Sequence, residues 1–109
     1  MKSIISAILL GIIFISCANE DSSTLKTAEA ILIWEGAYEV DGCGFIIEMR
    51  GKTYKPKDES KIGAEFMENH KTTVIIEYFL PNEILEYLCG DAPYYQKKEA
   101  LEIISINKR

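Results

Sequence analysis

The chain has 109 residues and a formal net charge of −5 at pH 7. This length has room for one small domain with a marginal hydrophobic core. Nucleic-acid affinity rests on lysines and arginines that neutralise phosphates, so the acidic balance argues against a nucleic-acid partner.

The first segment in chain order is typical of an export signal. Lys2 precedes an apolar stretch over residues 4–15, the pattern of a signal peptide. A membrane-spanning helix needs roughly 20 apolar residues, and this stretch is shorter. It ends in the small residue Ser16 followed by Cys17. We therefore expect residues 1–16 to be a signal peptide that is removed.

The end of this segment, Phe-Ile-Ser-Cys over residues 14–17, resembles the lipobox of bacterial lipoproteins, with Phe14 in place of the usual leucine. The resemblance implies that Cys17 receives a diacylglycerol and becomes the acylated N-terminus. Two or more acyl chains make such a membrane anchor stable. The alternative is a plain secretory signal with a chance cysteine.

Residues 17–27 are expected to be the lipidated cysteine and a flexible tether. The segment is polar and acidic, with too little apolar surface to fold. Its acidic residues, Glu20 and Asp21, also resemble the surface-export tags of lipoproteins in the Bacteroidetes group, although a simple solvated linker explains them equally well. The expected location is the bacterial cell envelope, on the outer membrane, facing the periplasm or the cell surface.

Two cysteines remain if Cys17 takes lipid, and only one pairing is then possible. Outside the cytoplasm Cys43 and Cys89 are expected to form a disulfide. The alternative is a reactive thiol, which needs a neighbouring base. The single histidine, His70, lies in a charged segment that has the composition of an exposed turn.

Residues 28–109 are expected to form one β domain. Alternation of apolar and polar residues predicts strands over 31–40 and 43–50, joined by the hairpin signal Asp41-Gly42, and a short strand over 53–55. Residues 57–71 are charged and irregular, and Ile62 and Phe66, four apart, predict one helical turn over the barrel. Further strands are expected over 72–80, 84–89 and 100–106, with a loop over 90–98.

Strands separated by turn signals, without alternating helices, predict an all-β sheet that closes into a five-stranded barrel. Closure removes the exposed edges that make small secreted domains aggregate. The expected disulfide connects the start of the second strand to the end of the fourth.

Several segments between residues 36 and 107 also resemble small uncharacterised envelope lipoproteins of the Bacteroidetes, a group with an OB-like barrel. They are residues 40–47, 51–56, 74–78, 89–90 and 103–106. The resemblance implies the OB-like fold and the envelope location, and it carries no activity.

No catalytic or metal-binding pattern is found. One histidine cannot make a nucleophile–base–acid set, and the cysteines and histidine lack zinc-ligand spacing. Asp58 and Glu59 lack the oxygen spacing of a calcium loop, so we interpret them as a solvated charge pair. No cofactor is expected.

These observations favour a non-catalytic binding or assembly module whose partner is a protein or another envelope component. One alternative is an inhibitor of a cationic hydrolase such as lysozyme, and another is a hydrolase that uses scattered carboxylates. In OB-like barrels ligands often contact the loop before the last strand. Tyr94 and Tyr95 lie in that loop beside Pro93 and are the candidate partner contact, because tyrosine is common in binding hot spots. The alternative is that one of these tyrosines folds back to cover the barrel end.

Overall fold

The computed structural model describes residues 24–90 and 93–109. The signal peptide, the lipidation site Cys17 and the first part of the expected tether lie outside the described residues. Within them the fold is all-β, and its only helical pieces are short 3-10 turns.

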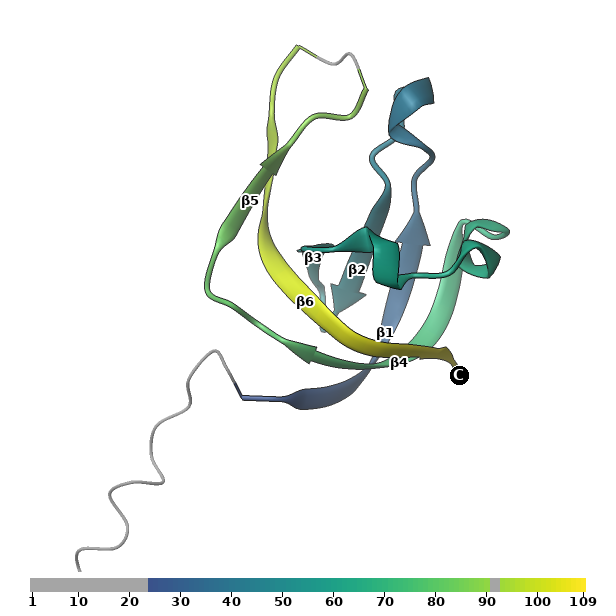
Figure 1. Ribbon diagram of the computed structural model, residues 1–109, viewed down its shortest axis with the longest axis vertical. Coiled ribbons are helices and arrows are strands. Elements are labelled where there is room, and N and C mark those ends of the chain that lie inside the picture. The colour runs from purple at the N-terminus through teal and green to yellow at the C-terminus, as the bar shows by residue number, and fades with distance from the viewer. Residues whose placement is uncertain (1–23, 91–92) are drawn as a thin grey trace, which may run out of the picture.

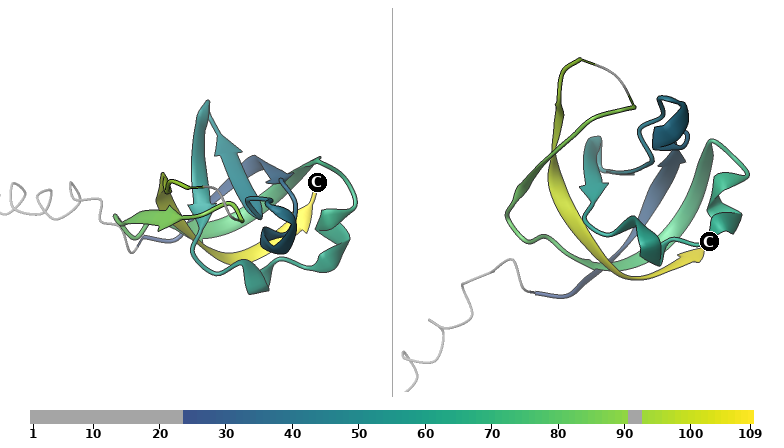
Figure 2. Two further views of the ribbon diagram at one scale, coloured as in Figure 1. Left: turned by 90° about the horizontal axis from the view of Figure 1, so that it is seen from above. Right: turned by 45° about the horizontal axis from the view of Figure 1, so that its top comes forward.

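A single sheet closes into a barrel (Figures 1 and 2). Its strands are β1 (Lys26–Trp34), β2 (Phe45–Met49), β3 (Lys52–Pro56), β4 (Lys71–Phe79), β5 (Ile84–Tyr87) and β6 (Gln96–Lys108). They follow the order β3-β2-β1-β4-β6-β5, and a parallel pairing of β3 with β6 closes the ring. Every other pairing is antiparallel. The five-stranded, OB-like barrel is confirmed, with β5 as an additional strand beside β6.

The barrel core is filled by alternate residues of these strands. On β4, Val74, Ile76 and Tyr78 are buried while Thr73 and Ile75 are exposed, because successive side chains of a strand point to opposite faces. The rest of the buried cluster comes from the other strands and from the segment between β3 and β4: Ala30, Leu32, Phe45, Ile47, Met49, Tyr54, Ile62, Phe66, Leu101 and Ile103.

The expected helical cover is present as two 3-10 turns, η4 (Glu59–Lys61) and η5 (Ala64–Met67). Ile62, directly after η4, and Phe66 within η5 are both buried in the barrel core. Two apolar anchors therefore hold an otherwise charged segment against the barrel. The single helical turn expected over both anchors is instead two turns, and Ile62 lies between them.

The predicted bounds of the first strand are wrong at both ends. β1 begins at Lys26, which pairs with Tyr78 of β4, so the last two residues assigned to the tether belong to the sheet. It ends at Trp34, because Gly36 adopts a positive φ of 95° and turns the chain out of the sheet. The expected Asp41-Gly42 hairpin is instead a longer loop that contains the 3-10 turn η3 (Tyr38–Val40).

The end of the chain also differs from the prediction. β5 covers residues 84–87 and pairs only with β6, so it is not one of the barrel strands; the short β3 takes that place. β6 begins at Gln96 and runs for 13 residues, so its first part was wrongly assigned to a loop. Pairing with β5 holds this first part extended, although its sequence is polar.

Candidate functional site

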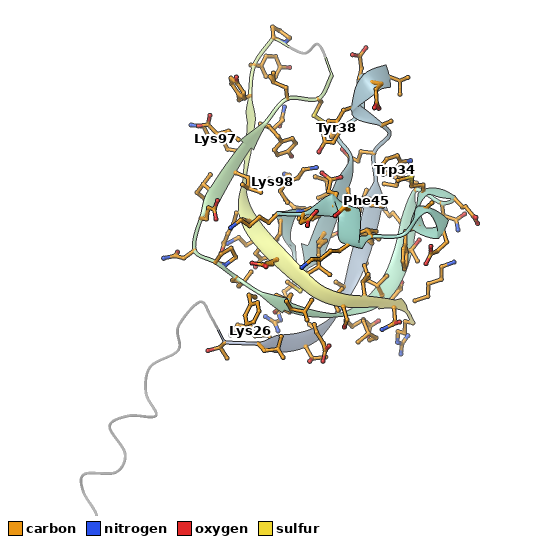
Figure 3. All side chains as sticks on the ribbon, in the orientation of Figure 1. Lys26, Trp34, Tyr38, Phe45, Lys97 and Lys98 are labelled. Atoms are coloured by element: carbon orange, nitrogen blue, oxygen red, sulfur yellow. A yellow bond between two sulfur atoms is a disulfide. The ribbon has the colours of Figure 1, made fainter. Side chains whose placement is uncertain are left out.

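Two loops meet at one end of the barrel. The β1–β2 loop spans residues 35–44, and the β5–β6 loop is described at residues 88–90 and 93–95. Both lie at the top of Figure 1, whereas β1 starts at the bottom. Figure 3 shows the same separation between Tyr38 and Lys26. We call these two loops the loop end.

The disulfide between Cys43 and Cys89 joins the two loops, with the Sγ atoms 2.00 Å apart and the Cα atoms 4.5 Å apart. The predicted pairing is confirmed. The backbones also touch, since a Cβ atom on Gly90 would lie 2.3 Å from the Cα of Asp41. Only glycine fits at this position, where φ is +65°. The bridge therefore links two loops that are already in contact.

Large apolar and aromatic side chains are exposed at the loop end. Tyr94 is 64% exposed and Tyr95 is 61% exposed. The interpretation that one tyrosine folds back over the barrel end is therefore wrong. Val40, at 74%, and Leu88, at 38%, are exposed on the same two loops. The candidate contact residues thus stand on a surface with further apolar side chains.

Beneath the loop end lies a polar cluster formed by Lys55, Glu59, Tyr38 and Tyr87. The Lys55 side chain is only 3% exposed, and its Nζ lies 3.0 Å from Glu59 Oε2. The same ammonium donates to the carbonyls of Cys43 at 2.6 Å and Phe45 at 3.0 Å. It also lies 5.1 Å from the ring centre of Tyr38 and 4.6 Å from that of Tyr87, which are cation–π distances.

Glu59 connects this cluster to the β1–β2 loop. Its Oε2 accepts a hydrogen bond from the Tyr38 hydroxyl at 2.6 Å, and its Oε1 accepts one from the Phe45 backbone N–H at 2.9 Å. The interpretation of Asp58 and Glu59 as a solvated charge pair is wrong for Glu59. Asp58 instead caps η4 by accepting from the N–H of Ser60 at 3.0 Å.

Burial governs the ionisation of the cluster. Desolvation lowers the pKa of Lys55 below its ordinary value, and the ion pair with Glu59 offsets only part of that change. Burial, assisted by the hydrogen bond to Glu59, raises the pKa of Tyr38 well above its ordinary value. Burial also raises the pKa of Tyr87. Burial therefore opposes the charge on Lys55 and favours the protonated form of both phenols.

The sequence analysis did not identify this cluster. Lys55 and Glu59 are four residues apart, but they lie on a strand and on the turn that follows it, so the helical pairing rule does not apply to them. Tyr38 and Tyr87 join them only because the barrel closes. No local sequence pattern marks Lys55 as a buried residue.

Other candidate chemistry stays apart from this cluster. His70 is exposed, as expected, and its Nδ1 lies 2.9 Å from the carbonyl oxygen of Trp34. Among residues 24–90 and 93–109, no three acidic, histidine or cysteine side chains gather in a way that could hold a metal ion. The described part of the chain has no helix long and apolar enough to span a membrane.

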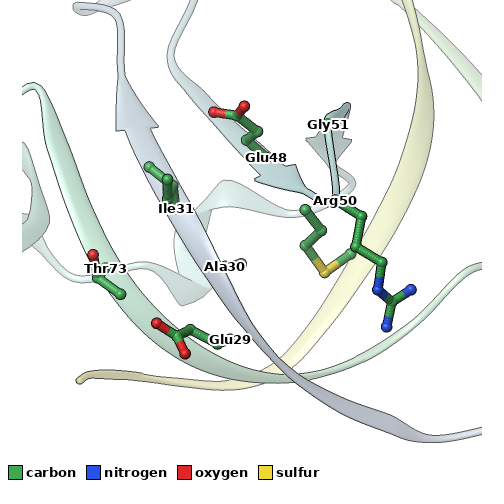
Figure 4. Close-up of a pocket in the computed structure, with 8 residues that line it drawn as sticks. Glu29, Ala30, Ile31, Glu48, Arg50, Gly51 and Thr73 are labelled. Carbon is green, nitrogen blue, oxygen red and sulfur yellow. The ribbon is translucent and has the colours of Figure 1, made fainter.

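A polar groove of about 430 Å³ lies on the outer face of β1, β2 and β4 (Figure 4). Its lining mixes the carboxylates of Glu29 and Glu48 with the guanidinium of Arg50. Glu29 is also 3.6 Å from Arg109, measured from Oε2 to Nε. Sites for small molecules are mostly apolar with few polar groups, and this groove lacks that character.

Comparison with known proteins identifies no relative: no protein-family model, no curated protein and no solved structure matches the chain. The geometry of the loop end is therefore the basis for a functional proposal.

Proposed function

We propose that this protein is a non-catalytic binding module, tethered by lipid to the bacterial outer membrane, that recognises a protein or another envelope component with its loop end. One observation carries the proposal: Tyr94 and Tyr95 are exposed on a loop that the Cys43–Cys89 disulfide fixes to its neighbour. Tyrosine offers a large amphipathic contact area and is enriched in binding hot spots.

A pre-organised surface favours binding because little conformational entropy is lost when the partner arrives. Two features restrict the loop end in this way. The disulfide joins its two loops, and Glu59 holds the β1–β2 loop through Tyr38 and Phe45. Exposed tyrosines on loops that are held in place in this way favour a function in recognition of a partner.

The position of the first strand is consistent with a tether. Lys26 lies at the end of the barrel opposite Tyr38 (Figure 3). A chain that joins the domain at Lys26 leaves the loop end facing away from its point of attachment. A lipid on Cys17 would therefore leave the binding surface accessible.

The polar cluster favours a non-catalytic function. Catalytic acids and bases need a proton that can be transferred to or from a substrate. The ammonium of Lys55 instead donates to Glu59 and to two backbone carbonyls, and its side chain is almost fully buried. We interpret the cluster as the support of the loop end.

The second candidate function is inhibition of a cationic hydrolase such as lysozyme. Glu35, Glu39 and Asp41 are exposed on the β1–β2 loop, and the described residues of the two loops include no lysine or arginine. Charge of this sign favours association with a basic protein. A lysozyme activity assay in the presence of the protein tests this candidate: undiminished lysozyme activity at micromolar protein excludes it for that hydrolase.

The main test is affinity capture from envelope extract with three proteins: the parent, Tyr94→Ser/Tyr95→Ser, and the control Ile75→Ser/Ile104→Ser. The control removes exposed apolar side chains from β4 and β6. We expect the tyrosine variant to melt like the parent and to lose the captured partner, while the control keeps it. A tyrosine variant that is destabilised but still binds the partner contradicts the proposed surface.

The anchor has its own test. Labelling with a clickable fatty acid should modify the parent and should be abolished in Cys17→Ser. Equal labelling of both proteins would exclude Cys17 as the lipidation site.

A further inference from the structure

β5 is the terminal strand of the described sheet, and its outer edge is free. The strand order ends in β6-β5, and among the described residues β5 pairs with β6 alone. Figures 1 and 2 show β5 on the outside of the molecule. The ring closes between β3 and β6, so closure leaves this edge open. We call the side of residues 84–87 that faces away from β6 the β5 edge.

The β5 edge presents the backbone groups of Ile84 and Glu86. The N–H of Ala100 donates to the carbonyl of Glu83 at 2.8 Å, so these two residues form a hydrogen-bonded pair of the antiparallel ladder. Because hydrogen-bonded pairs alternate along such a ladder, the backbone groups of Leu85 also point to β6. Those of Ile84 and Glu86 point the other way, where no backbone hydrogen bond between described residues reaches them.

The strand that carries this edge is held in place. The Tyr87 ring lies 4.6 Å from Lys55 Nζ, measured to the ring centre, so the end of β5 packs on the polar cluster. Cys89 follows two residues later and is bonded to Cys43. A strand fixed in this way loses little conformational entropy when another strand pairs with it.

The side chains of the β5 edge define what an added strand would need. Ile84 is 61% exposed and the Glu86 side chain is 54% exposed, whereas Leu85 is half-buried. Glu86 lies 3.7 Å from the exposed Lys97, measured from Oε2 to Nζ, and exposed pairs of this kind are weak. A basic side chain opposite Glu86 is therefore favoured, as opposite charges are across paired strands. The loop end that follows β5 has acidic side chains and no lysine or arginine among its described residues.

We propose that the partner recognised at the loop end is a protein that adds an extended segment to the β5 edge, with apolar residues opposite Ile84 and Leu85 and a basic residue opposite Glu86. In strand addition the main-chain hydrogen bonds give affinity and alternate side chains give specificity. The proposal rests on the proposed function, because β5 leads directly into the loop with Tyr94 and Tyr95.

A second copy of the chain suits the β5 edge less well than a different protein. The strand has four residues and includes the charged Glu86. Short length and charge are features that limit pairing between identical edges. The protein is also acidic as a whole, with a net charge of −5, so a basic segment is the better match for the edge and the adjoining loop end.

The test uses the oxidised full chain with Cys17→Ser, which prevents lipid attachment. In the free protein, the amide hydrogens of Ile84 and Glu86 should exchange with solvent faster than that of Leu85, which is bonded to β6. The acetylated and amidated peptide Thr-Lys-Val-Ile-Thr is then titrated and followed by NMR. We expect saturable shifts and slower exchange at Ile84 and Glu86. The peptide Thr-Glu-Val-Ile-Thr should bind more weakly.

Proline variants separate the backbone edge from the side chains. Ile84→Pro removes an N–H that makes no bond to β6, so it should melt like the parent. It should weaken peptide binding by about tenfold or more, since an edge hydrogen bond is lost and the ring blocks pairing. Ile84→Ser is the matched control, which keeps the N–H and should bind better than Ile84→Pro. Glu86→Gln should abolish the preference for the lysine peptide over the glutamate peptide.

Equal peptide binding by the parent and Ile84→Pro overturns the proposal, as does the absence of any shift at Ile84 and Glu86. A molar mass of the free parent that rises with concentration, and stays monomeric in Ile84→Pro, assigns the edge to a second copy and also overturns it. Affinity capture from envelope extract separates this proposal from the proposed function. A partner lost by Tyr94→Ser/Tyr95→Ser but kept by Ile84→Pro rejects strand addition alone, and the reverse result rejects the tyrosine surface alone.

Discussion

Lys55 is the least expected residue of the structure, because a lysine that is 3% exposed normally costs stability through lost hydration. Its ammonium is surrounded by a carboxylate, two carbonyls and two aromatic rings. One of those carbonyls belongs to Cys43, so the charge contacts the same loop that the disulfide holds. The residue is therefore both a buried charge and a support of the loop end.

Replacement of Lys55 by Met should lower the free energy of unfolding by about 2 kcal/mol. Removing one partner of a buried ion pair leaves the other charge uncompensated. The effect stays moderate because Glu59 keeps its bonds to Tyr38 and Phe45. Urea denaturation measures it, with Lys52→Met as the matched control from an exposed pair, which should cost less than about 1 kcal/mol. Equal losses in the two variants would contradict a structural role for Lys55.

Tyr38 should make the domain sensitive to alkaline pH. The pKa of Tyr38 is raised in the fold, so the folded protein keeps a phenol proton that the unfolded chain loses above about pH 10. The stability linked to this proton is present below pH 10 and is lost as the pH rises. The lowered pKa of Lys55 acts in the opposite direction, because it makes the stability of the fold rise with pH. This rise ends near pH 10.5, the ordinary pKa of lysine.

Tyr38→Phe should therefore show a shallower loss of stability above pH 10 than the parent. At neutral pH it should cost no more than about 1 kcal/mol, the usual value of one hydrogen bond. Chemical denaturation between pH 8 and pH 11.5 gives both quantities. Tyr95→Phe is the control, since it removes an exposed hydroxyl. A pH profile of Tyr38→Phe identical to that of the parent would show that this phenol does not titrate with folding.

At the scale of elements, the strands in which apolar and polar residues alternate could be predicted from the sequence. Strand segments that form only by pairing with a distant strand could not. The pattern over residues 72–80 predicted β4 almost to the residue. The first part of β6 is polar, and only its pairing with β5 makes it a strand. Lys26 and Thr27 have the composition of a linker, but they belong to the sheet because they pair with β4. The local sequence pattern does not predict a strand when that strand forms only because it pairs with another strand far away in the sequence.

The candidate site also has features that could be predicted from the sequence and features that could not. Cys43 and Cys89 were predictable as a pair on the expectation that Cys17 is lipidated, since only these two cysteines then remain. The exposure of Tyr94 and Tyr95 was one of two open interpretations, and only the packing of the barrel end decides between them. The contact of Glu59 with Tyr38 joins residues 21 positions apart and has no sequence signature.

Cys43→Ser and Cys89→Ser should each lower stability by about 4 kcal/mol. The bridge closes a segment with a sequence separation of 46, and the chain-entropy model gives this value for a loop of that length. The double variant should be little worse than either single one, since all three lack the same bond. Thermal melts of the three oxidised proteins test this. Two free thiols in the intact mass of the oxidised parent would refute the bridge itself.

As a whole molecule, the protein is an acidic barrel with different surfaces at its two ends. β1 enters at one end, and the disulfide-linked loops form the other (Figures 1 and 3). Binding to a partner at the loop end and attachment through the first strand are therefore compatible in one small domain.

The acidic surface should prevent binding to nucleic acid. A net charge of −5 leaves too little positive surface to displace the counterions of DNA or RNA. In a gel-shift assay at physiological salt, micromolar protein should leave both nucleic acids unshifted. A shift that disappears at higher salt would disprove this expectation.

The central claim, that the loop end is the recognition surface, is tested most directly by site-specific photo-crosslinking in cells that natively make the protein. A photoreactive amino acid is placed at Tyr95 in one strain and at Lys71, on the exposed start of β4, in another. We expect one discrete protein adduct from position 95 and none from position 71. No adduct at position 95, or the same adducts at both positions, would contradict the claim.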